Sequence, residues 1–144
     1  RTLRTALQVA VELKDARLEA EARTSLGRLF VEQGRHADAG RMLRAALVGA
    51  EALGAPGLCG LLGGCLAELS FLEGRAEEGR REMESSLLRL RNSEQRSHAH
   101  DLLVRWAELE ASEGLTERAE ELIAQSESEA ELSHADGPVT FPSF

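Results

Sequence analysis

The sequence predicts an all-α protein in which antiparallel helix pairs stack on one another. The composition is rich in Leu, Ala, Glu and Arg, with 3% aromatic residues and 3 prolines, and so favours helices over strands. Glycine recurs at Gly34, Gly74 and Gly114, and the residues around these glycines recur with the same 40-residue offset. At 144 residues, the chain is long enough for one cooperative domain.

The 40-residue offset places large apolar residues over one another and small residues over small ones. The matching sets are Leu26 with Leu66 and Trp106, Leu29 with Leu69 and Leu109, Gly27 with Ala67 and Ala107, and Ala39 with Gly79 and Ala119. Small residues at fixed positions allow two helix backbones to approach closely. Self-similarity at a period of this size is typical of a solenoid, so each glycine is expected at the turn inside one helix pair.

The offset also extends toward the N-terminus, where residues 3–13 align with residues 43–53. Residues 1–15 are therefore expected to be a half repeat, the second helix of a pair whose first helix is missing. The predicted full repeats span 16–55, 56–94 and 95–132. Because the chain begins with Arg1 and not with Met, we expect it to be part of a longer protein.

Seven helices follow from this division, at 1–14, 16–33, 36–53, 58–73, 76–91, 95–113 and 116–132. The segment 54–57, GAPG, is a strong break between repeats, and 91–94, RNSE, is a weaker one. Helix 58–73 contains Gly60, Gly63 and Gly64, and each interior glycine costs about 1 kcal/mol relative to alanine. Either tight packing requires these glycines, or this helix is less stable than the others.

The pattern ends near Leu132, and residues 133–144, SHADGPVTFPSF, are predicted to be a C-terminal tail. Three roles stay open for it: a cap over the last helix, a linear motif that docks elsewhere or on another copy, or a disordered segment.

Charge and hydropathy argue against nucleic acid and membranes as partners. The net charge of −8 repels phosphate backbones and anionic lipids. No apolar run approaches the roughly 18 residues that a membrane span needs. Cys59 and Cys65 are the only cysteines, and their spacing places them on different sides of one helix, so we expect reduced, buried thiols in the cytoplasm.

No residue pattern indicates catalysis, a metal or a cofactor. His36, His98, His100 and His134 lack the i, i+4 spacing of a helical metal site. Runs of glutamate such as Glu120-Glu121 are typical of solvated helix faces, and no phosphate loop or nucleophile elbow occurs. We therefore expect no catalytic residue, no metal and no cofactor.

The segment from Leu26 to Leu47, LGRLFVEQGRHADAGRMLRAAL, resembles the tetratricopeptide repeat (TPR) family. It carries the family's Leu-Gly pair, an aromatic residue at Phe30, the turn glycine at Gly34 and an Ala-Leu pair at its end. The second and third repeats depart from the pattern with Ser70 and Glu110 at the aromatic position. A 40-residue period is longer than the family's usual length of about 34 residues and implies longer second helices, as in the long-helix subgroup found in bacterial multidomain regulators.

This resemblance implies a right-handed superhelix and a non-catalytic scaffold that binds a protein or peptide, within a larger cytoplasmic, bacterial regulatory or signalling protein. In the family, the first helices line a concave groove. The corresponding residues here are Thr24, Arg28, Val31, Leu61, Glu68, Phe71, Leu72, Asp101, Val104 and Glu108. For Phe71 and Leu72, burial against a neighbouring helix is an equal alternative.

Two other functions stay open at this point. One is a sensor in which a peptide or small molecule in the groove gates an attached kinase or DNA-binding domain, and the other is a structural spacer. We also expect self-association, either through the C-terminal tail or through an N-terminal edge at which Leu3, Leu7 and Val11 are exposed.

Overall fold

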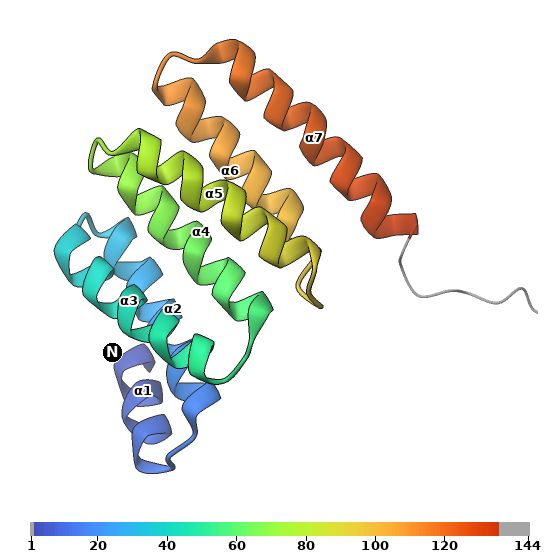
Figure 1. Cartoon of the computed structure of the whole chain (residues 1–144). Helices are drawn as coiled ribbons and strands as arrows, with labels where there is room; N and C mark the ends of the chain where they lie inside the picture. The colour runs from blue at the N-terminus through green and yellow to red at the C-terminus, as the bar shows by residue number, and fades with distance from the viewer. Residues whose placement is uncertain (1, 136–144) are drawn as a thin grey trace, which may run out of the picture.

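A computed structural model describes the backbone of residues 2–135 and the side chains of residues 2–132. Within this range the chain forms seven helices and no strand, which confirms the predicted all-α class. Neighbouring helices run antiparallel and follow one another along a single stack (Figure 1). The helices are α1 (Thr2–Glu12), α2 (Ala16–Glu32), α3 (His36–Ala52), α4 (Pro56–Leu72), α5 (Ala76–Arg91), α6 (His98–Ser112) and α7 (Thr116–Ala135).

The closest packing joins α2 with α3, α4 with α5, and α6 with α7, while α1 packs on α2. These are the three pairs and the single leading helix that the sequence predicts. The last helix continues to Ala135, so the segment 133–144 predicted to be a tail begins inside α7. The rest of that segment lies outside the described residues.

Short turns join most of the helices, and they share one geometry. The residue after the helix C-cap has a positive φ: 55° at Lys14, 74° at Gly34, 62° at Gly54, 80° at Gly74 and 83° at Gly114. The next amide donates to the carbonyl five residues earlier at 2.8–3.1 Å, as in a Schellman motif. The predicted role of the recurring glycines as turn residues is confirmed. Lys14 and Gly54 make the same turn between one pair and the next, so a turn of this kind occurs at half the repeat period.

The 40-residue period depends on the lengths of both helices in a pair, whereas the sequence-based expectation assigned the extra length to the second helix alone. The sequence predicts longer second helices. In the first pair, α2 and α3 have 17 residues each, and in the second pair α4 has 17 and α5 has 16, so both helices share the extra length. Only in the third pair is the second helix the longer one, with 20 residues in α7 and 15 in α6. Helix α4 begins at Pro56 and not at residue 58, because proline is well suited to the first turn of a helix.

The connection between α5 and α6 has a different construction. The Ser93 hydroxyl donates to the Leu90 carbonyl at 2.9 Å and accepts from the Gln95 amide at 3.0 Å. This side-chain-stabilised turn delays the start of α6 to His98, where we expected residue 95.

The glycines of α4 are needed for packing. A Cβ atom on Gly60 would lie 2.9 Å from Leu90 Cγ, and one on Gly63 would overlap the Ser86 hydroxyl of α5. On the side facing α6, Gly64 is limited in the same way. These contacts decide between the two interpretations of the glycine-rich helix in favour of tight packing.

The N-terminal edge is more covered than predicted. Leu3 and Leu7 are half-buried against the cluster that contains Leu26 and Phe30, because α1 lies on α2 with these leucines facing it. The expectation that both are exposed is therefore wrong, whereas Val11 is 49% exposed. Self-association through this edge stays a prediction.

Candidate binding groove

The inner face of the stack consists of the first helices of the three pairs. Helices α2 and α4 approach each other closely, as do α4 and α6. In contrast, no Cα atom of α1, α3, α5 or α7 lies within 8 Å of another helix of that set in the described part of the chain. The inner helices therefore form a continuous wall, and the outer helices stand apart from one another.

Two adjoining hollows open on the inner face, with volumes of about 280 and 310 Å³. We call them together the inner groove. Of the predicted groove residues, the ones that line it are Thr24, Arg28, Val31, Leu61, Glu68 and Asp101. The structure thus brings together predicted residues from all three inner helices.

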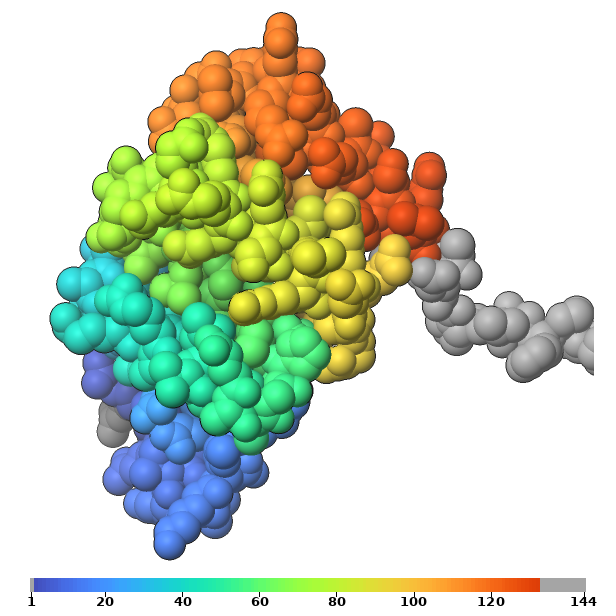
Figure 2. All heavy atoms as spheres, viewed as in Figure 1, coloured from blue at the N-terminus to red at the C-terminus, as the bar shows by residue number. Residues whose placement is uncertain are grey.

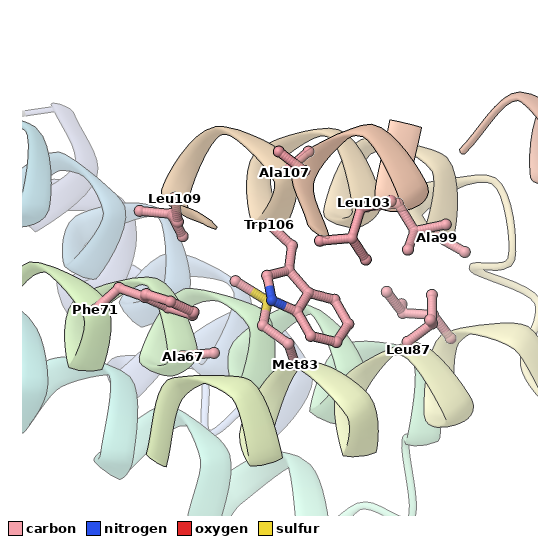
Figure 3. Close-up of a cluster of buried hydrophobic side chains, with 12 residues drawn as sticks. Ala67, Phe71, Met83, Leu87, Ala99, Leu103, Trp106, Ala107 and Leu109 are labelled. Carbon is pink, nitrogen blue, oxygen red and sulfur yellow. The ribbon is translucent and has the colours of Figure 1, made fainter. Parts of the chain in front are cut away.

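Phe71 does not belong to the inner groove. It is 5% exposed and lies in the core between α4, α5 and α6, near Ala67 and Leu109 (Figure 3). A Cβ atom on Gly79 would come within 2.6 Å of its ring, so the missing side chain of Gly79 makes the space for it. The groove assignment of Phe71 is therefore wrong, and the alternative of burial is correct.

Three further predicted residues lie outside the inner groove. Leu72 is 43% exposed, Val104 is half-buried and Glu108 is exposed, but none lines either hollow. The prediction placed groove residues on α4 and α6 by adding one and two full repeat lengths to the residue numbers on α2. In the structure, Glu68 of α4 contacts Arg105 of α6, and these two residues are separated by less than one repeat length. The groove-facing turn of α6 is consequently nearer its N-terminus than a constant offset predicts.

The groove residues that escaped the sequence-based prediction include Cys65 on α4, and His98, Leu102 and Arg105 on α6. On α6 they have the i, i+4, i+7 spacing that places residues on one side of a helix. That spacing was available in the sequence, but nothing in it distinguishes this stripe from the neighbouring one that contains Val104.

An ion pair crosses the inner groove. Arg105 Nε donates to Glu68 Oε1 at 2.9 Å, and Arg105 Nη1 donates to Glu108 at 3.1 Å. The hydrogen bond to Glu68, the largest influence, holds the pKa of Arg105 above its usual range. Arg28 lines both hollows and makes no ion pair with the described residues, so its guanidinium can bind an anionic group.

Apolar and neutral groups form the middle of the inner groove. Leu61 and Leu102 are half-buried there. Burial raises the pKa of the Cys65 thiol to about 11, so this thiol is neutral at pH 7. The Thr24 hydroxyl donates to the Ala20 carbonyl at 2.7 Å and is already satisfied within its own helix.

Within residues 2–132, no cluster of three or more His, Cys, Asp and Glu side chains could hold a metal ion. In the described part of the chain, no helix has the length and apolar character needed to cross a membrane. Comparison with models of known protein families, with curated proteins and with solved structures gives no match.

Proposed function

We propose that this chain is a non-catalytic scaffold for protein–protein interaction, a TPR-like module of a larger cytoplasmic, bacterial regulatory or signalling protein. The observation that carries the proposal is the inner groove, in which Leu61 and Leu102 lie between the charged side chains of Arg28, Glu68 and Arg105. An apolar centre with a charged rim is the usual anatomy of a site for a peptide or a partner helix.

Charge and rigidity narrow the kind of partner. Arg28 has no anionic partner among the described residues, so it favours an acidic side chain on the bound segment. The close contacts at Gly60 and Gly64 hold α4 firmly between its neighbours, which makes the groove pre-formed and reduces the ordering cost of binding. The free thiols of Cys59 and Cys65 agree with a reducing cytoplasm.

Charge reversal in the inner groove tests this proposal. Proteins captured by the wild-type chain are purified, and their dissociation constants are measured for wild type, Arg28→Glu and Arg81→Glu. Arg81 is an exposed arginine on the outer helix α5, so its variant has the same charge change outside the groove. We expect at least about tenfold weaker binding for Arg28→Glu only. Equal affinities of all three proteins would exclude the inner groove as the binding site.

The size of the hollows favours a second candidate, the ligand-sensing domain. Volumes of about 280 and 310 Å³ are close to the lower end for small-molecule sites. A peptide or metabolite of this size in the groove would then gate an attached kinase or DNA-binding domain. The test is a thermal-shift screen of short acidic peptides and carboxylate metabolites. We expect a ligand that raises the melting temperature of wild type but not of Arg28→Glu. If no compound in this library does so, the ligand-sensing function is excluded.

A further inference from the structure

The outer face has a hollow that the proposed function does not use. It has a volume of about 410 Å³ and lies between α3 and α5. Because these two helices stand apart, α4 forms its floor, visible as green atoms between α3 and α5 in Figure 2. Its lining includes three arginines, two glutamates, a leucine and a serine: Arg44, Arg75, Arg89, Glu78, Glu82, Leu66 and Ser70. We call it the outer hollow.

The preceding crevice, between α1 and α3, has an aromatic residue at the corresponding position and a hollow of about 450 Å³ beside it. There Phe30 stands one repeat before Ser70, and its side chain is only 5% exposed. The guanidinium carbon of Arg35 lies 4.4 Å from the centre of the Phe30 ring, and that of Arg4 lies 5.8 Å from it. Leu26, in the same cluster, is 2% exposed. An aromatic ring thus fills this place, with a leucine beside it and two cations over it.

The outer hollow has the same surroundings without the ring. Arg44 and Arg75 line it at the positions that correspond to Arg4 and Arg35. The floor leucine, Leu66, is half-buried, whereas its counterpart in the first crevice is fully buried. The short Ser70 side chain is 3% exposed at the bottom of the hollow. Its hydroxyl lies 3.1 Å from the Leu66 carbonyl and 3.4 Å from Glu82 Oε1, so the Glu82 side chain reaches over it.

No aromatic side chain next to Ser70 in the sequence enters the outer hollow, and the third crevice has a large side chain at the corresponding position. Phe71, the next residue, points into the core on the side of α6. Between α5 and α7, the corresponding position is Glu110, which is fully buried and ion-paired with Arg80. The corresponding position therefore holds a large side chain in the first and third crevices and the short Ser70 in the second.

We infer that the outer hollow is a docking site for an aromatic side chain of a partner peptide, which takes the place that Phe30 takes in the first crevice. The ring lies on Leu66 and receives Arg44 and Arg75 over its faces. Arg44 and Arg89 make no ion pair with the described residues, so a carboxylate next to the aromatic residue adds charge complementarity. The ring displaces the Glu82 carboxylate from the Ser70 hydroxyl, and Glu82 then accepts a hydrogen bond from a peptide N–H. This site lies on the opposite face from the inner groove and goes beyond the proposed function.

The test uses residues 1–144 labelled for NMR and two peptides, acetyl-Asp-Phe-Asp-amide and acetyl-Asp-Leu-Asp-amide. We expect saturable amide shifts around Ser70 and Arg75, with at least about threefold tighter binding of the phenylalanine peptide. Equal binding of the two peptides, or no saturable shift at these residues, would overturn the inference. A loss of the shifts in Arg28→Glu would place the peptide in the inner groove and would also overturn it.

Substitutions at Ser70 provide the matched variants. Ser70→Phe should occupy the hollow from within, raise the melting temperature by about 3 °C and abolish binding of the phenylalanine peptide. Ser70→Ala keeps the hollow open and should bind as wild type does. If Ser70→Phe does not fold, Arg75→Ala replaces it, with at least about threefold weaker binding expected and Arg81→Ala as the control. Unchanged binding in Ser70→Phe or Arg75→Ala refutes the site.

Discussion

Replacing Glu110 by alanine tests the polar network that joins the second and third helix pairs. The Glu110 carboxylate is fully buried. It accepts hydrogen bonds from Arg80 Nε at 2.9 and 3.1 Å, from Arg80 Nη2 at 2.9 Å and from Trp106 Nε1 at 3.2 Å. The Arg80 side chain is 25% exposed and can regain water after the substitution, whereas Trp106 is 2% exposed and loses this acceptor in the core.

The size of the effect follows from these exposures. Removing one partner of a buried ion pair costs about 3–5 kcal/mol, and a buried N–H without an acceptor costs about 1–3 kcal/mol. Because Arg80 recovers part of its hydration, we expect the lower end of the first range, about 3 kcal/mol of unfolding free energy. For a domain of this size, this corresponds to a decrease in melting temperature of about 10 °C.

Urea denaturation of wild type, Glu110→Ala, Arg80→Ala and the double variant measures this effect as a shift in midpoint at constant slope. Arg80→Ala alone should cost a similar amount, since it leaves Glu110 buried and unpaired, and the double variant should cost clearly less than the sum. Glu121→Ala is the control, because Glu121 is 65% exposed and its pair with Arg118 contributes less than about 1 kcal/mol. A Glu110→Ala protein within about 0.5 kcal/mol of wild type, or strict additivity, would refute the argument.

Other substitutions have clear expected outcomes. Phe71→Ala should reduce the unfolding free energy by about 3–4 kcal/mol in urea titrations, and at temperatures where it stays folded it should leave the affinity of the inner groove unchanged. Gly27→Ala should destabilise by about 1–3 kcal/mol, because a Cβ there lies 2.5 Å from a leucine of α3, and a stable variant would contradict that packing. In contrast, Gly49→Ala should stabilise by about 0.5–1 kcal/mol, since nothing lies within 4 Å, and a loss of stability would show an unseen contact. Lys14→Gly should stabilise by about 1 kcal/mol because φ is 55° there, and an unchanged midpoint would show that the turn carries no strain. Finally, Cys65, with a pKa of about 11, should react with iodoacetamide at pH 7 at least about tenfold more slowly in the folded than in the urea-unfolded protein, and similar rates would mean that the thiol is accessible.

Local chain geometry made most of the fold predictable from the sequence. A helix that ends in a left-handed residue selects glycine, so Gly34, Gly74 and Gly114 mark their turns in the sequence itself. At Lys14, the same turn is made by a residue with a Cβ atom, so composition alone gives no signal. The late start of α6 depends on hydrogen bonds of the Ser93 side chain, which leave no periodic pattern.

The inner groove was only partly predictable, because it depends on how one helix pair sits on the next. Positions on α2 and α4 such as Arg28 and Leu61 were found, since these helices keep the same register within the repeat. The turns of α6 that face the inner groove depend on long-range contacts, including the pair between Glu68 and Arg105, that a repeat length does not encode. The burial of Phe71 similarly requires the missing side chain of Gly79, which lies on another helix.

The regular spacing of the turns restricts how the length of this chain can change during evolution. From α1 to α5, turns of the shared geometry occur at half the repeat period, but a helix returns to the same face of the stack only after a full period. Deleting one helix with its turn, such as residues 35–54, would keep every other turn intact and yet move all later helices to the opposite face, with their buried and exposed sides exchanged. Deleting or duplicating a whole pair, such as residues 35–74, preserves both patterns, so insertions and deletions are tolerated in whole helix pairs.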